Sequence, residues 1–113
     1  MIYQISSDNL SLTPSMEALG REKTQKLEKF FPNLPPDEVK ARIVLNKGSR
    51  EGMFEVKFEL SVRGKRYFSQ EKNFSLETAV INCVDEIERQ LEKSRNENER
   101  DWEKLRDLKV WQD

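Results

Sequence analysis

The chain has 113 residues and a nearly balanced charge, with 20 basic and 21 acidic side chains. This length predicts one domain, and a chain of this size buries roughly two-thirds of its unfolded surface, enough for a core without disulfides or metal ions. Because the charges almost cancel, only local clusters of basic residues can indicate a polyanionic partner.

The composition also restricts catalysis and metal binding. With no histidine, the chain lacks the commonest metal ligand and cannot build a Ser-His-Asp or Cys-His catalytic group. Cys83 is the only cysteine, so it forms no disulfide within the chain and cannot hold zinc alone. The glycine-containing run at 48–52 lacks the spacing and the lysine of a phosphate-binding loop. We therefore expect a protein that binds rather than catalyses, without a cofactor or metal.

The sequence favours a cytoplasmic protein. Residues 1–20 lack the basic start and apolar run of a signal peptide. No stretch approaches the ~18 consecutive apolar residues of a membrane span. The single cysteine agrees with a reducing compartment, and we expect it to be a small buried hydrophobic residue.

The first third of the chain predicts a strand and then a helix. Residues 1–6 are rich in β-favouring side chains. Thr13 and Pro14 are typical of a helix start, a capping threonine followed by proline at the first helical position. We expect this helix to end at Phe31, because Pro32 and the prolines after it prevent its continuation.

The apolar stripe of this first helix is irregular. Met16, Leu19 and Leu27 recur at roughly helical spacing, but Lys23 interrupts them. Gly20 weakens the helix by ~1 kcal/mol relative to alanine.

Three strands are predicted next. Residues 39–46 alternate between apolar and polar side chains, and residues 54–63 give the clearest alternation in the chain. A tight hairpin turn then leads into residues 66–74, where either Tyr67 or Phe68 faces the core. The charged residues that alternate along the middle strand predict a solvated outer sheet face.

The second helix is predicted from the cap Ser75 to Arg95. The element order is therefore β-α-β-β-β-α, an α+β two-layer fold with a four-stranded sheet and both helices on one face. We expect the first strand at a sheet edge, beside the second. The apolar stripe of the second helix contains Leu76, Ala79, Val80, Cys83, Val84, Ile87 and Leu91.

We divide the chain into a domain at 1–95 and a charged C-terminal segment at 96–113. In this segment, either the second helix continues to about Leu108 or a short separate helix forms. Trp102 and Trp111 are expected either to pack back on the domain or to form a contact in a homodimer or with a protein partner.

Basic residues gather near the two helices and are our candidate RNA contacts. If the helices lie side by side, these residues form a positive strip suited to phosphate oxygens, which bind without reading base sequence. The alternative is ordinary helix solubility, with pairing to Glu22 and Glu28. The candidates are Lys23, Lys26, Lys29, Lys72, Arg89, Lys93 and Arg95.

Two segments resemble one protein family. Residues 5–31, ISSDNLSLTPSMEALGREKTQKLEKFF, are similar to that family's first strand, its Thr-Pro helix start and a helix ending in Lys-Leu-Glu-Lys and an aromatic residue. Residues 79–93, AVINCVDEIERQLEK, are similar to its second helix and end in the same Arg-Gln-Leu-x-Lys pattern. With three strands between these motifs, residues 1–95 resemble the ribosome hibernation-promoting factor and ribosome-associated inhibitor family, also called sigma-54 modulation proteins.

The resemblance implies a non-catalytic cytoplasmic protein that binds the small ribosomal subunit and its 16S-type ribosomal RNA. Family members occupy the channel for messenger and transfer RNA, which inhibits translation under stress or in stationary phase. The implied fold is similar to a double-stranded-RNA-binding domain, and its basic helix face contacts ribosomal RNA. Lys23, Lys26 and Lys29 fall where the family carries basic residues. Since 113 residues leave no room for the dimerisation domain of long members, the chain resembles a short form.

Two acidic residues depart from the family pattern. Glu77 stands where the family usually has an aromatic residue, and Glu86 stands where it usually has lysine. They favour an alternative hypothesis, a protein-interaction module on the same fold with weakened RNA binding that uses Trp102 and Trp111. A third hypothesis is a binder of double-stranded RNA outside the ribosome.

Overall fold

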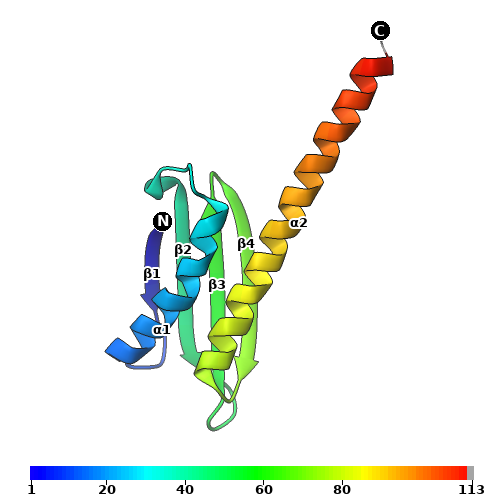
Figure 1. Cartoon of the computed structure of the whole chain (residues 1–113). Coiled ribbons are helices and arrows are strands. Elements are labelled where there is room, and N and C mark those ends of the chain that lie inside the picture. Colours follow the sequence, from blue (N-terminus) through cyan, green and yellow to red (C-terminus); the bar gives the residue numbers. More distant parts are fainter. Residues whose placement is uncertain (112–113) are drawn as a thin grey trace.

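The computed structural model describes the backbone of residues 1–111 and the side chains of residues 1–95. Both long helices cross the same face of a four-stranded sheet (Figure 1), which confirms the predicted α+β two-layer fold. The elements are β1 (Ile2–Ser6), α1 (Pro14–Gln25), the 3-10 helices η1 (Lys26–Phe30) and η2 (Pro36–Glu38), β2 (Val39–Lys47), β3 (Phe54–Val62), β4 (Lys65–Asn73) and α2 (Leu76–Trp111).

The sheet has the strand order β1-β2-β3-β4. β1 lies at the edge beside β2, as expected, and runs parallel to it because the chain crosses over through α1 between the two strands. The other pairs are antiparallel. Arg63 and Gly64 both have positive φ, 49° and 84°. Such a pair forms the two-residue turn that matches the twist of a hairpin.

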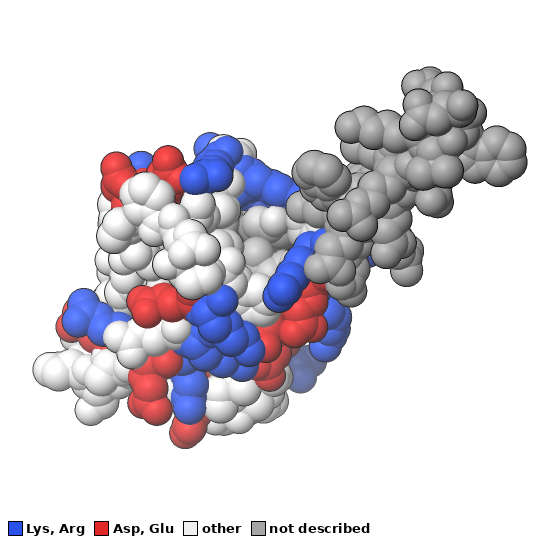
Figure 2. Space-filling view, turned by 45° about the horizontal axis from the view of Figure 1, so that its top comes forward, with Lys and Arg blue, Asp and Glu red and all other residues white. Residues whose placement is uncertain are grey.

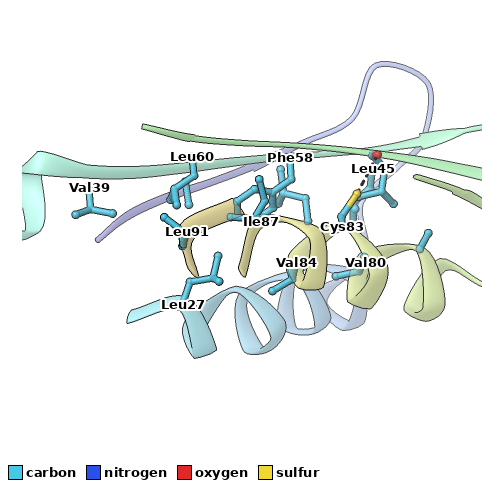
Figure 3. Packing of buried hydrophobic residues seen from close by; sticks show 14 residues of the cluster. Leu27, Val39, Leu45, Phe58, Leu60, Val80, Cys83, Val84, Ile87 and Leu91 are labelled. Carbon is cyan, nitrogen blue, oxygen red and sulfur yellow. Dashed lines mark hydrogen bonds between the residues drawn. The ribbon is translucent and has the colours of Figure 1, made fainter. Parts of the chain in front are cut away.

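The core lies between the sheet and the helices (Figure 3). β2 and β3 supply every second residue, as their alternation predicts, and α2 supplies its apolar stripe. Cys83 is fully buried, as expected, and its Sγ donates to the carbonyl of Val56 at 3.3 Å. Burial raises the pKa of this thiol to about 11. The buried hydrophobic residues are Leu27, Val39, Ala41, Ile43, Leu45, Val56, Phe58, Leu60, Ala79, Val80, Cys83, Val84, Ile87 and Leu91.

The register of β4 decides between Tyr67 and Phe68. Tyr67 pairs with the buried Leu60 and therefore faces the helices, where its hydroxyl donates to Ser94 Oγ at 3.2 Å. Phe68 pairs with Glu59 on the other face of the sheet and is 55% exposed. A large aromatic side chain thus stands on the side that no helix covers.

The first helix begins as predicted and ends earlier. Thr13 Oγ1 accepts a hydrogen bond from the backbone N–H of Met16 at 3.2 Å. α1 stops at Gln25, and the chain tightens into η1 before Pro32. The predicted single helix to Phe31 is therefore two elements, since the last turn before a helix stop commonly becomes 3-10.

Gly20 lies where α1 packs against β1. A Cβ atom at this position would sit 2.5 Å from Tyr3 Oη and 3.1 Å from Ile5 Cδ1. Glycine therefore permits the close approach of helix and strand, which explains a residue that weakens the helix when its sequence is considered alone.

α2 begins where Ser75 Oγ accepts from the N–H of Thr78 at 3.2 Å. It continues as one helix past the end of the sheet to Trp111 (Figure 1), which confirms the first of the two alternatives for this segment. The side chains of Trp102 and Trp111 lie outside the described residues, so their packing stays a prediction. Among the described residues, no helix combines the length and apolar character needed to cross a membrane.

Candidate nucleic-acid interface

α1 and the following η1 lie beside α2, and η1 brings Lys26 and Lys29 to this boundary. Lys26 Nζ pairs with Asp85 Oδ1 and lies 3.2 Å from Glu88 Oε2. Lys29 Nζ lies 2.9 Å from Glu88 Oε1. The step from Lys26 to Lys29 on η1 matches the step from Asp85 to Glu88 on α2. The two helical segments therefore run in the same direction. We call these four residues the helix seam.

The helix seam holds two positive and two negative charges that stabilise one another. The hydrogen bond from Lys29 lowers the pKa of Glu88, partial burial opposes this effect, and the hydrogen bond from Lys26 adds to it. The hydrogen bond to Asp85 raises the pKa of Lys26. Glu88 keeps only 20% of its side chain exposed. A phosphate at the helix seam must therefore compete with carboxylates already in place.

The other predicted residues on the helices differ in how available they are. Lys23 is 29% exposed at its side chain and lies 3.9 Å from Glu22. Arg89 is 76% exposed but pairs with Glu86 at 2.9 Å, so the acidic residue that departs from the family pattern is the partner of a predicted RNA contact. Lys93 is exposed and makes no ion pair within residues 1–95. Arg95 is exposed close to it on α2.

Lys72 lies on the opposite face of the sheet from the helices. It pairs with Glu55 in the β3–β4 register, and the neighbouring Val56 is the residue that faces the core. The other six candidates therefore lie on the helical side, where Lys26 and Lys29 share Glu88, and Lys72 lies apart from them. The register of β4 sets this position, because a shift of one residue moves a side chain to the other face.

The helical side as a whole has no excess of positive charge. Residues 14–31 and 76–95 together carry seven basic and eight acidic side chains. In the view of Figure 2, blue areas are bordered by red ones over the visible face. Asp85 and Glu88, which neutralise two of the predicted lysines, were missed in the sequence because their partners lie 59 residues away.

Comparisons with known proteins agree with this fold. The family model for sigma 54 modulation protein / S30EA ribosomal protein matches residues 3–99, which include both motifs noted in the sequence. No curated protein matches the chain.

Two solved structures are similar to this one. The Protein Y N-terminal domain of Thermus thermophilus has a TM-score of 0.68 and 21% identity, over 81% of this chain and 96% of that one. A ribosomal subunit interface protein from Coxiella burnetii has a TM-score of 0.69 and 17% identity, over 85% and 99% of the two chains. At these identities the likeness demonstrates the shared fold.

Proposed function

Because this chain belongs to the sigma 54 modulation protein / S30EA ribosomal protein family, we propose that it is a non-catalytic protein that binds the small ribosomal subunit. It occupies the channel for messenger and transfer RNA and inhibits translation under stress or in stationary phase. The match over residues 3–99 is the observation that carries this proposal. The likeness of its fold to a ribosomal subunit interface protein supports it.

The proposed mechanism is steric occupancy anchored by phosphate contacts. Arg89, Lys93 and Arg95 are exposed along one stretch of α2, and Lys23 lies on α1. Lysine and arginine that neutralise phosphates release counterions, so binding weakens as salt rises. Lys26 and Lys29 join this surface where phosphate oxygens replace the carboxylates of the helix seam.

Sedimentation with purified small subunits tests the proposal. We expect the wild-type chain to travel with the subunits in low salt and to dissociate as salt rises. The double variant Arg89→Glu, Lys93→Glu should remain at the top of the gradient. Lys26→Glu is a poor choice here, since it would place three carboxylates together at the helix seam and disturb folding.

The matched control makes the same charge change away from the helical face. Lys47 and Arg50 are exposed near the β2–β3 loop, and their double change to glutamate should leave sedimentation unchanged. A wild-type chain that stays at the top in low salt, with subunits in excess, would refute the proposal.

The charge distribution on the helical side favours a second candidate, a protein-interaction module with weakened RNA affinity. Its support is the neutralised helix seam together with the Arg89–Glu86 pair. Deleting residues 96–113 separates the two candidates. Loss of a dimer or of a bound protein, with sedimentation unchanged, assigns the C-terminal segment a role of its own.

A further inference from the structure

The face of the sheet away from the helices carries the net positive charge that the helical side lacks. Its residues are the alternate strand positions whose neighbours face the core. We call it the outer sheet face. Its charged residues are the basic Lys40, Arg42, Lys57, Arg66 and Lys72 and the acidic Glu55 and Glu59.

The cations of the outer sheet face are held loosely. Lys57 lies 3.8 Å from Glu55, and Arg66 lies 3.8 Å from Glu59, both beyond hydrogen-bonding distance. Within residues 1–95, Arg42 makes no ion pair. Glu59 is its cross-strand neighbour in the β2–β3 ladder. The corresponding nitrogen-to-oxygen distances at the helix seam are 2.9 and 3.2 Å. An anion can therefore bind these cations without breaking close ion pairs.

An exposed aromatic ring lies on the same face, with Glu59 as its cross-strand neighbour and with Arg42 and Lys57 around the same hollow. Phe68 lies in one cross-strand row with Glu59 and Arg42. Its backbone carbonyl accepts a hydrogen bond from Gln90 Nε2 at 2.9 Å, which ties β4 to α2 at this residue. Beside the ring is a shallow hollow of about 240 Å³, whose side chains include those of Asp8, Arg42, Val44, Lys57, Glu59 and Phe68.

We propose that the outer sheet face binds single-stranded RNA, with one base stacked on Phe68 and phosphates contacted by Arg42, Lys57 and Arg66. A sheet that presents an aromatic ring between cations suits an unpaired base, because the base offers its face to the ring and the backbone offers its phosphates to the cations. A duplex hides its base faces. An acidic peptide would use the cations and leave the ring without a role.

This surface and the helical side lie on opposite sides of the core, so the chain can use both at once. The choice of RNA over DNA rests on the proposed function. The charge and the aromatic ring of the outer sheet face belong to the strands and do not involve the helices. Oligonucleotide binding without ribosomes therefore tests it separately from sedimentation with subunits.

The test is fluorescence anisotropy with a labelled 12-nucleotide oligouridine at low salt and the full chain. Removing one stacking ring weakens single-strand binding by about 5-fold to 160-fold. Phe68→Leu should therefore raise the Kd by that factor, while Phe68→Tyr retains binding. Phe74→Leu is the matched control, since Phe74 is 61% exposed and lies beyond the end of β4. It should bind as the wild type does.

Charge variants give the second arm of the test. The double variant Arg42→Gln, Lys57→Gln should reduce the slope of log Kd against log salt by about 1.4, because each phosphate contact on a single strand contributes about 0.7. Arg89→Gln with Lys93→Gln should leave oligouridine binding intact even where it abolishes sedimentation with subunits. Circular dichroism confirms that each variant is folded.

Several results would overturn the proposal. They are equal affinity of Phe68→Leu and wild type, a loss in Phe74→Leu as large as that in Phe68→Leu, tighter binding of a 12-base-pair duplex than of the single strand, and binding of polyglutamate as tight as that of oligouridine.

Discussion

Replacing Glu88 by glutamine removes the carboxylate that both seam lysines share. Lys29 lies 2.9 Å from this carboxylate and Lys26 lies 3.2 Å from it, while Lys26 retains Asp85. Glu88→Gln keeps the shape of the side chain and deletes its charge. It therefore tests whether the helix seam is a structural contact, an obstacle to RNA, or both.

The two effects have opposite signs. Exposed ion pairs contribute about 0.2–1 kcal/mol each to stability. Because Glu88 is partly buried, losing its two ion pairs should lower the unfolding free energy by roughly 1–2 kcal/mol. In contrast, ribosome binding should tighten because the Lys29 ammonium loses its carboxylate partner and becomes available, whereas Lys26 stays paired with Asp85. If Lys29 then contacts a phosphate, the salt slope of binding steepens by about 0.9.

Urea denaturation and salt-dependent sedimentation with small subunits measure these effects. Glu92→Gln is the matched control, because it removes one negative charge from an exposed position on α2 outside the helix seam. The stability difference between wild type and Glu88→Gln should also depend on pH. The pKa of Glu88 is lowered by folding, so its contribution is present above the unfolded carboxyl pKa near 4.3 and is lost as pH falls through the lower folded value. Equal behaviour of Glu88→Gln and Glu92→Gln in both assays would show that the carboxylate of Glu88 neither stabilises the fold nor restrains the seam lysines.

Three further predictions concern the core. Gly20→Ala should lower the unfolding free energy measured in urea by about 1 kcal/mol, because overpacking costs about 1–3 kcal/mol and the gain in helix propensity is only about 1 kcal/mol. The loss should shrink in a Tyr3→Phe background, since Tyr3 Oη is the atom nearest to the added Cβ. Burial raises the pKa of Tyr3 to about 12. Its ionisation should therefore appear as a late step when tyrosine absorbance is followed with rising pH. Its contribution to stability is present below pH 10 and is lost as pH rises toward 12. The thiol of Cys83 should react with a thiol reagent at pH 8 only after unfolding, so a rapid reaction of the native chain would contradict its burial.

Most of the fold could be predicted from local signals in the sequence. Thr13 and Ser75 each accept a backbone N–H at the start of a helix, and a cap depends only on residues three positions apart. The core face of β3 follows from period-two alternation. These features need no knowledge of which distant segments meet.

The candidate site could be predicted only in part, because it depends on how distant elements pack. The helical placement of Lys26 and Lys29 was evident, but their pairing with Asp85 and Glu88 depends on how far along α1 and η1 the chain meets α2. The sheet face on which Phe68 lies could not be predicted from the sequence either. Its face depends on a one-residue choice of register that an irregular pattern in β4 leaves open.

The most direct test of the proposed function is competition on purified small ribosomal subunits. Labelled messenger RNA and transfer RNA are added after the subunits have been incubated with a stoichiometric amount of this chain. We expect the wild-type chain to prevent both RNAs from binding and the variant Arg89→Glu, Lys93→Glu to leave their binding unchanged. A chain that sediments with the subunits while both RNAs bind undiminished would contradict occupancy of the channel.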